Sequence, residues 1–353
     1  MTFDEARRRF PVLERFAYLN AGTFGPLARA TTEAMAEEQR AEVERGRAGR
    51  GYFERLLGLR ESVRAGLAAQ IGVPPENVSL TGSTTAGCNV VLQGLGLGPD
   101  DEVVTTTDEH FGLIGPLLVS RARLRVVEPD ADAILAAVGP RTRLLAVSHV
   151  TWTTGKVLPV ARLREQAGVP LLADGAQGAG AIPVDATRVD FYTVSAQKWL
   201  CGPDGTGALY VRDPGSMRVS AASYFGQAAY DLEELSWEAK PGAARFDPGP
   251  VPMPVLAGLE AALADLPEWR FERAREMTDR CHKLLSGRFD VVSAPGEGTL
   301  VSWRPEGDAA ELAQQAYERG VIIRNLPTRG WLRASCGWWT SDDDLARLVE
   351  AVS

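Results

Sequence analysis

The chain has 353 residues, of which 45% are hydrophobic and 24% are charged, an ordinary globular composition with enough apolar material for about two domains. Its formal net charge is −8 and it has no basic clusters, which argues against nucleic acid or an anionic membrane surface as a partner. No apolar run is long enough to span a bilayer, and the first residues lack the apolar core of a secretory signal, so we expect a cytoplasmic protein.

The hydrophobic pattern up to about residue 215 predicts two helices followed by alternating strands and helices. The first two helices are expected over residues 27–45 and 51–70. Strands are expected at 77–81, 102–106, 123–128, 144–150, 170–173, 190–194 and 207–211, with helices at 84–95, 130–138 and 160–167. Because short apolar runs alternate with helices, we predict an α/β fold whose mostly parallel sheet is covered on both faces.

The pattern changes after about residue 215, and the segment 241–254, rich in proline and glycine, is expected to cross between two domains. Beyond it we expect helices at 255–266, 268–285, 309–318 and 342–351, and strands near 289–292, 299–303, 321–323 and 331–334. We therefore predict a large domain over residues 18–240 and a small α+β domain made of residues 1–17 and 241–353.

Residues able to bind metals or form disulfides are few and scattered. The cysteines form no CxxC pair and are expected to be reduced thiols; they are Cys88, Cys201, Cys281 and Cys336. Only three histidines occur, so we expect no metal site. Lysine is equally scarce, because arginine supplies most of the 38 basic residues; the lysines are Lys156, Lys198, Lys240 and Lys283. Any chemistry that needs a lysine therefore has four candidates.

Two strands of the predicted sheet end in residues that can carry chemistry. Asp174 ends a buried strand, although an aspartate before a Gly-Ala turn is, taken alone, more often a turn or helix-capping residue. Lys198 follows the next strand, and the simpler interpretation, a solvated surface lysine, is weakened by the scarcity of lysine. Ligands of doubly wound sheets bind at the carboxyl ends of the strands. A lysine and a carboxylate there are the pair that pyridoxal 5′-phosphate (PLP) requires, for a Schiff base and for a protonated pyridine nitrogen.

A phosphate site and an aromatic ring are also indicated. The stretch from Thr81 to Gly87 places a glycine turn and hydroxyls at the start of a predicted helix, where backbone N–H groups bind anions. An ordinary helix N-cap is the alternative interpretation. His110 follows another strand and offers a flat ring that can stack on a heterocycle, although a lone histidine is more often structural.

In combination, these motifs resemble the class V aminotransferases, the branch of fold-type I PLP-dependent enzymes that includes cysteine desulfurases and isopenicillin N epimerase. The resemblance is carried by Asp174-Gly-Ala-Gln177 and by Ser195-x-x-Lys198 with its Gly-Pro-x-Gly-x-Gly tail, and it extends from Tyr18 to the last helix. It implies a large domain with a mostly parallel seven-stranded sheet, a small C-terminal α+β domain and a homodimer.

The resemblance also implies roles for the matching residues. Lys198 would form the Schiff base, Asp174 would pair with the pyridine nitrogen, His110 would stack on the ring, and Gln177 would bind the ring oxygen. The residues implied to hold the phosphate are Thr84, Thr85, Ser195 and Gln197. The residues implied to contact the substrate are Arg333, which would clamp its carboxylate, Gly22 and Trp152.

The sequence departs from the desulfurase pattern where a desulfurase carries its attacking cysteine. That cysteine precedes the arginine matching Arg333 on a mobile loop, whereas the segment 324–330 contains none. Cys336 lies beyond the arginine, and Cys201 lies in a loop that we expect to be static. Pro250 replaces the threonine that reaches the partner subunit's phosphate, which leaves that contact without its hydroxyl.

We therefore predict a PLP-dependent lyase or transferase that acts on a small amino acid. Elimination of a β-sulfur group without a persulfide-forming cysteine is favoured over transamination and epimerisation. A catalytically silent PLP-binding protein is the alternative from another class, which the complete set of Lys198, Asp174 and Arg333 disfavours. A nicotinamide-dependent enzyme is disfavoured because no Gly-x-Gly-x-x-Gly motif follows the first strand.

Overall fold

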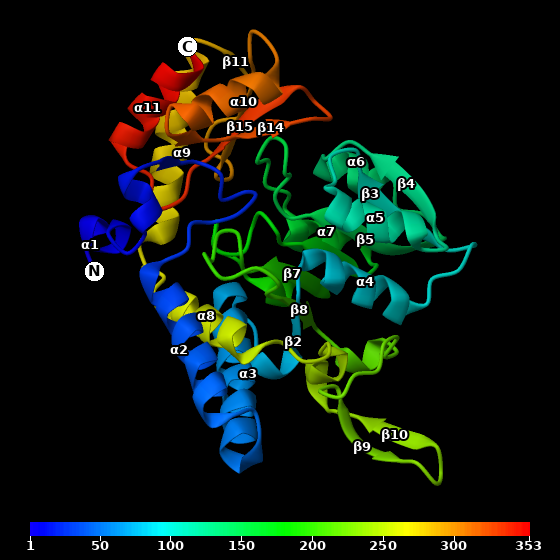
Figure 1. The fold of residues 1–353 in the computed structure, drawn as a ribbon. Coiled ribbons are helices and arrows are strands. Elements are labelled where there is room, and N and C mark those ends of the chain that lie inside the picture. The colour runs from blue at the N-terminus through cyan, green and yellow to red at the C-terminus, as the bar shows by residue number, and fades with distance from the viewer.

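The computed structural model describes residues 1–353, and its larger sheet has seven strands in the order β2-β8-β7-β6-β5-β3-β4 (Figure 1). The strands are β2 (Val78–Thr81), β3 (Glu102–Thr106), β4 (Arg123–Val127), β5 (Thr142–Ser148), β6 (Leu171–Asp174), β7 (Phe191–Ser195) and β8 (Gly207–Val211). β8 runs antiparallel to both of its neighbours, and all other pairs are parallel. The predicted mostly parallel seven-stranded sheet is therefore confirmed.

Helices cover both faces of this sheet because its strands are apolar on both sides. In β5, Leu145 and Val147 join one apolar core, whereas Leu144 and Ala146 join another. The first core includes side chains of α3 (Gly49–Ile71), α6 (Ala131–Ala136), α7 (Val160–Ala167) and α8 (Met253–Ala264). The second includes side chains of α4 (Thr84–Leu95) and α5 (Phe111–Val119). The strands are therefore packed on both faces.

A smaller antiparallel sheet lies beside the larger one. Its four strands, in order, are β11 (Asp290–Val291), β12 (Leu300–Arg304), β15 (Trp331–Ser335) and β14 (Arg324–Leu326). The helices α9 (Arg270–Ser286), α10 (Ala309–Glu318) and α11 (Asp342–Val352) share an apolar core with it. The N-terminal segment joins this part, because β1 (Ala17–Tyr18) pairs with β13 (Val321–Ile322) and Arg7 of α1 (Phe3–Arg7) forms an ion pair with Asp344.

Helix α8 (Met253–Ala264), which was expected at 255–266, packs with the helices beside the larger sheet rather than with the smaller sheet. It falls within residues 241–353, but its apolar side chains pack against α2 (Arg29–Arg45) and α3, and Leu256 and Leu259 join the core under the larger sheet. Figure 1 shows α2, α3 and α8 as one helical group at the edge of the molecule.

Helix α5 and one hairpin are among the elements that were not predicted from the sequence. Helix α5 was missed because its nine residues include two glycines and Pro116, although His110 caps its first turn. The hairpin of β9 (Gln227–Asp231) and β10 (Ser236–Ala239) extends away from the body, with Leu232 and Leu235 exposed near its tip (Figure 1). No helix combines the length and the apolar character that crossing a membrane requires.

Candidate active site

Lys198 lies just beyond the end of β7, in a backbone that is packed tightly around it. Gly25 N–H donates to the carbonyl of Gln197, and a Cβ atom on Gly25 would lie 2.0 Å from the carbonyl oxygen of Lys198, so only glycine fits there. Burial lowers the pKa of Lys198 to about 8, with Asp174 opposing this shift and Arg333 adding to it. The amine therefore loses its proton more easily than an ordinary lysine does, which favours a role as nucleophile or base.

Asp174 lies at the end of the neighbouring strand β6, and its carboxylate is 3% exposed without a cationic partner. Its Oδ1 accepts hydrogen bonds from the N–H of Ala176 (2.9 Å) and the hydroxyl of Thr193 (3.4 Å), whereas Oδ2 accepts none. A buried carboxylate without a counter-ion is costly. Its free oxygen therefore suits a protonated ring nitrogen of a ligand.

Gln177 and His110 are positioned by the backbone around them. The amide of Gln177 donates to the carbonyl of Gly22 (2.8 Å) and accepts from the indole of Trp199 (2.9 Å), which leaves one N–H for a ligand. His110 Nδ1 accepts from the N–H of Gly112 (3.0 Å), so the neutral ring carries its proton on Nε2. Desolvation lowers the pKa of His110, and Lys198 contributes to the shift. A neutral, oriented ring can pack against a heterocycle.

The first turn of α4 meets the end of β7. Ser83 caps the helix, and Ser195 Oγ accepts from the N–H of Thr84 (3.2 Å) and lies 3.3 Å from its Oγ1. Thr85 Oγ1 lies 2.8 Å from where a Cβ of Gly112 would be, which brings the start of α5 close as well. These hydroxyls, with the positive end of a twelve-residue helix, form a site suited to a phosphate. Gln197 lies beside them, and its buried Oε1 has no hydrogen-bond partner.

Arg333 projects from β15 toward the same place and is 2% exposed. It donates to the carbonyl of Trp152 (2.6 Å) and approaches the hydroxyl of Thr23 (3.5 Å), while its buried Nε has no partner. A Cβ on Gly22 would lie 2.7 Å from its Nη2, so the glycine makes room for the guanidinium. No carboxylate of the protein pairs with Arg333, although burial lowers its pKa to about 9, with Arg324 adding to the shift. A carboxylate ligand would satisfy this group.

The aminotransferase class-V family model matches residues 18–296, more than half of the chain. The chain belongs to this family. It is 31% identical to isopenicillin N epimerase of Streptomyces clavuligerus over 99% of this chain and 97% of that protein. It is 25% identical to cysteine desulfurase CsdA of Escherichia coli over 98% of this chain and 96% of that one.

Solved structures give the same assignment. A structure of C-DES with glycine covalently linked to its PLP cofactor superimposes with a TM-score of 0.91 at 26% identity, covering 98% of both chains. The complex of the cystine C–S lyase C-DES with its product cysteine persulfide also has a TM-score of 0.91, covering 97% of this chain and 98% of that one. The protein is thus a PLP-dependent class V enzyme, and the free amine, the unpaired carboxylate and the phosphate-type helix terminus described above fit that cofactor.

The expected site residues of this class V enzyme lie together. Lys198, Asp174 and Arg333 are near enough to shift the pKa of one another or of His110. Trp152 packs edge-on against the His110 ring, with ring centroids 5.1 Å apart. The roles of the individual residues remain those that the family resemblance implies, and we carry them forward as proposals.

Sequence reasoning missed two residues of the site. Arg324 on β14 lies directly opposite Arg333, a position that becomes visible only once the strand pairing is known. Glu109 lies next to His110, and its carboxylate accepts from the hydroxyl of Thr106 (2.6 Å) and the N–H of Ser148 (3.0 Å), which joins the ends of β3 and β5. Burial raises the pKa of Glu109 to about 7. Glu109 could have been predicted from its place in the Asp-Glu-His sequence that follows β3, but the sequence analysis considered only His110 there.

The four cysteines of the enzyme are all buried and unpaired. Burial raises the pKa of Cys201, which lies in the loop after Lys198. Cys336 directly follows β15, is fully buried and contacts Cys281 within the apolar core of the smaller sheet. A nucleophilic cysteine needs access and a depressed pKa. None of the four has both properties.

In this chain, the segment that matches the cysteine-bearing loop of desulfurases forms an ion pair with a residue that follows the larger sheet. Arg329 forms an ion pair with Asp108 (3.3 Å), whose carboxylate also accepts a hydrogen bond from Thr153. This ion pair joins the segment after β14 to the end of β3. The segment is therefore short and anchored, and it contains no thiol.

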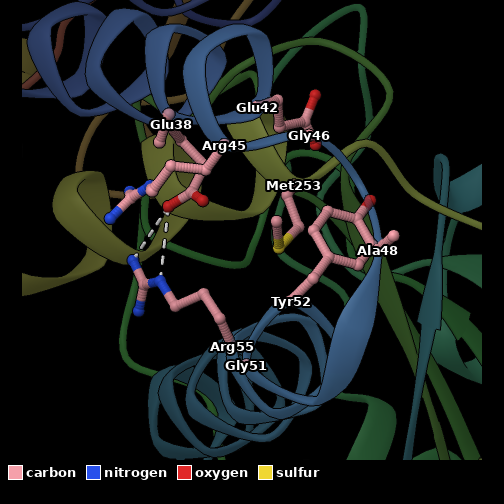
Figure 2. Close-up of a pocket in the computed structure, with 10 residues that line it drawn as sticks. Glu38, Glu42, Arg45, Gly46, Ala48, Gly51, Tyr52, Arg55 and Met253 are labelled. Atoms are coloured by element: carbon pink, nitrogen blue, oxygen red, sulfur yellow. Dashed lines mark hydrogen bonds and ion pairs between the residues drawn. The ribbon is translucent and has the colours of Figure 1, made fainter.

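One hollow of the helical edge group lies away from the proposed site residues. A cavity of about 530 Å³ lies between α2 and α3, with Met253 of α8 at its floor (Figure 2). Figure 2 shows Glu38 facing Arg55, an ion pair at 3.3 Å, with Met253 between this pair and Tyr52 in the view. Because both signs of charge line it and none of the site residues does, this cavity is not part of the active site.

Proposed function

We propose that the protein is a PLP-dependent C–S lyase, which eliminates a β-sulfur group from a cysteine derivative without passing the sulfur to one of its own cysteines. The observation that carries this proposal is the buried state of all four cysteines beside an otherwise complete site. The similarity to C-DES, described as a cystine C–S lyase, supports it. With one water consumed in hydrolysis of the eliminated enamine, the products would be pyruvate, ammonia and the released thiol.

The site residues would have two kinds of role, which are binding of substrate and cofactor and transfer of the α-proton. Arg333 binds the α-carboxylate with two N–H donors and so fixes the orientation of Cα. Asp174 holds a proton at the ring nitrogen, and His110 packs against the ring. PLP, when bound, withdraws the electron pair left at Cα. The Lys198 amine removes the α-proton as a neutral base, and the β C–S bond then breaks with its electron pair leaving on sulfur.

The product balance of a cysteine conjugate tests the proposal. We expect the holoenzyme to release pyruvate, ammonia and thiol in equal amounts from S-alkyl-L-cysteines, and to leave L-alanine, which has no leaving group, without pyruvate. Pyruvate is measured by lactate dehydrogenase coupling and thiol by a disulfide reagent. Equal turnover of L-alanine and a keto acid acceptor, with no thiol release, would identify an aminotransferase instead.

Epimerisation is the second candidate, because the chain is 31% identical to an isopenicillin N epimerase over nearly its full length. An epimerase must return a proton to Cα from the face opposite Lys198. Chiral chromatography of amino acids recovered from D₂O distinguishes the two reactions. Recovered D-enantiomer carrying deuterium at Cα, without pyruvate, would favour the epimerase.

We propose that the enzyme is a homodimer. The outer surfaces of α2 and α3 support this, because Val43 of α2 and Phe53 and Leu57 of α3 are exposed. The exposed leucines of the β9–β10 hairpin offer a second apolar surface. Light scattering tests the proposal, and a fully active monomer would contradict it.

We also propose that residues 18–240, together with α8, form the cofactor-binding domain, so that the chain passes to the smaller domain after α8 rather than before it. The packing of α8 on α2 and α3 supports the later crossing. Limited proteolysis should cut between 264 and 270 and leave α8 with the larger fragment.

We propose a cytoplasmic location for the enzyme. Its four unpaired cysteines are compatible with a reducing compartment, and cell fractionation tests the location.

A further inference from the structure

Two arginines lie side by side on one face of the smaller sheet. In the antiparallel pairing of β14 with β15, Arg324 is directly opposite Arg333. Side chains at directly opposed positions of an antiparallel pair project from the same face of the sheet. Arg333 is buried against Trp152, whereas Arg324 is exposed. The face that holds the proposed carboxylate clamp therefore carries a second guanidinium beside it.

Arg324 has no partner within the protein. It forms no ion pair and no side-chain hydrogen bond, although most other arginines near the two sheets do, including Arg329 with Asp108 and Arg304 with Asp290. Like charges opposed across a pair of strands destabilise the sheet. Arg324 also lies close enough to lower the pKa of both Arg333 and His110. Its positive charge thus acts on the site and is not neutralised by the chain.

An aromatic side chain lies on the same face as the two arginines. Trp331 lies two residues before Arg333 on β15, so its ring is on the same face. It borders a hollow of about 400 Å³ whose lining contains neither Arg324 nor Arg333 and includes Glu128 and Glu297. A substrate carboxylate beside Arg324 would therefore lie outside that acidic hollow, where the Arg324 side chain is exposed.

We propose that Arg324 binds a second carboxylate of the substrate, so that the enzyme prefers cysteine derivatives whose sulfur substituent ends in a carboxylate. This inference rests on the proposed function in one respect, that Arg333 holds the α-carboxylate. The two guanidinium groups then bind the two ends of a dicarboxylic amino acid. The S-linked chain of the substrate would connect the two bound carboxylates.

Direct binding tests the subsite without any turnover. Glutarate and its monoamide, glutaramate, have the same length and differ in one carboxylate, and calorimetry of the holoenzyme measures both. We expect glutarate to bind about 10–100-fold more tightly, as a charge-assisted hydrogen bond allows. Arg324→Gln should reduce glutarate binding to the level of glutaramate, and Arg324→Lys should retain part of the difference. The matched control is Arg143→Gln, at the opposite end of β5, which should change neither affinity.

Turnover separates this inference from the proposed function. S-(carboxymethyl)-L-cysteine should be cleaved with a kcat/KM about 10–100-fold above that of its amide analogue, and Arg324→Gln should remove that preference. Equal rates for the acid and the amide in the wild type would overturn the second-carboxylate subsite while leaving the lyase intact. Tight, Arg324-dependent glutarate binding with no thiol released from either conjugate would overturn the lyase and support the subsite. Because Arg324→Gln removes a like-charge pair, its melting temperature should stay level or rise, which excludes misfolding as the cause.

Discussion

The two sheets contribute opposite kinds of surface to the active site. On the seven-stranded sheet, the polar side chains bind one another or the backbone, as Ser195 does with Thr84 and Gln177 with Gly22 and Trp199. On the four-stranded sheet, Arg333 and Arg324 have no acidic partner. The first surface is organised before a ligand arrives, whereas the second holds positive charge that a ligand must neutralise.

We propose that the larger sheet carries the cofactor-binding residues that the family shares, and that the smaller sheet sets the substrate preference of this enzyme. Strand ends of the larger sheet hold the cofactor residues at fixed positions, and their hydrogen bonds determine their orientation. Under the proposed function, the smaller sheet would determine which amino acid is bound, because unpaired guanidinium groups select for carboxylates. Changes on the larger sheet should therefore affect the chemical step, and changes on the smaller sheet should affect discrimination between substrates.

The largest effect is expected at Lys198. Lys198→Ala removes the base and the cofactor attachment point, so kcat should fall by at least about 10³-fold in the pyruvate assay. Lys156→Ala, an exposed lysine of the same chain, is the control and should keep full activity. Borohydride treatment of the wild type should place the reduced cofactor on Lys198 in a peptide map. Attachment at Lys156, Lys240 or Lys283 would contradict the assignment.

Asp174→Asn should retain cofactor and lose most of its turnover. The amide carries no charge, so it cannot raise the pKa of the ring nitrogen in a buried site. A change of two pKa units in that nitrogen corresponds to a loss of about 10²-fold in kcat, measured at saturating substrate. A variant that turns over at nearly the wild-type rate would show that the carboxylate has no electronic role.

Arg333→Ala should cut kcat/KM by about 10²-fold, the loss of a charge-assisted contact worth about 2–3 kcal/mol. The effect should appear mainly as a higher KM, in contrast to Asp174→Asn, and Arg333→Lys should recover part of it. Steady-state kinetics with one S-alkylcysteine measures both constants. A fall in kcat with an unchanged KM would move Arg333 out of substrate binding.

Glu109 should make the stability of the protein depend on pH. Its pKa is raised from 4.5 to about 7 in the folded protein, so its contribution to stability is complete below pH 4.5 and is lost as the pH rises through about 7. Glu109→Gln should therefore reduce the pH dependence of the unfolding free energy between pH 4.5 and 7, by on the order of 1–3 kcal/mol. Urea unfolding at several pH values measures it, and parallel curves for the two proteins would contradict the assignment.

The smallest effect on chemistry is expected from the cysteines. Replacing Cys201 and Cys336 together with serine should leave kcat for elimination within a few-fold of wild type, while two buried hydroxyls cost about 1–3 kcal/mol each in stability. Thermal unfolding and the pyruvate assay report the two effects separately. A loss of activity larger than the loss of folded protein would indicate a chemical role for a thiol.

The positions of Asp174 and Lys198 could be predicted from the sequence because each lies at or just beyond the end of a strand. The boundaries of α4, β3, α7, β8 and α10 agree with the prediction, since continuous apolar runs and capping residues mark them. Asp174 and Lys198 follow two such runs, which places them at one edge of the sheet before any coordinates are known.

The substrate side could be predicted only in part, because it depends on contacts between distant segments. Arg324 is opposite Arg333 through the register of β14, a three-residue strand that the hydrophobic pattern does not reveal. The packing of α8 on α2 and α3 likewise joins segments about 200 residues apart in the chain, beyond the reach of local pattern.

The most direct test of the account follows the sulfur atom. Wild-type holoenzyme is mixed with a stoichiometric amount of L-cystine or S-alkyl-L-cysteine, quenched after one turnover, and its intact mass is compared with that of the untreated protein. A C–S lyase that does not use its own cysteines should keep its unmodified mass, with all of the released sulfur in small-molecule thiol or persulfide. A protein heavier by one sulfur atom, with the addition mapped to Cys201 or Cys336 and released by a thiol, would contradict it and identify a desulfurase.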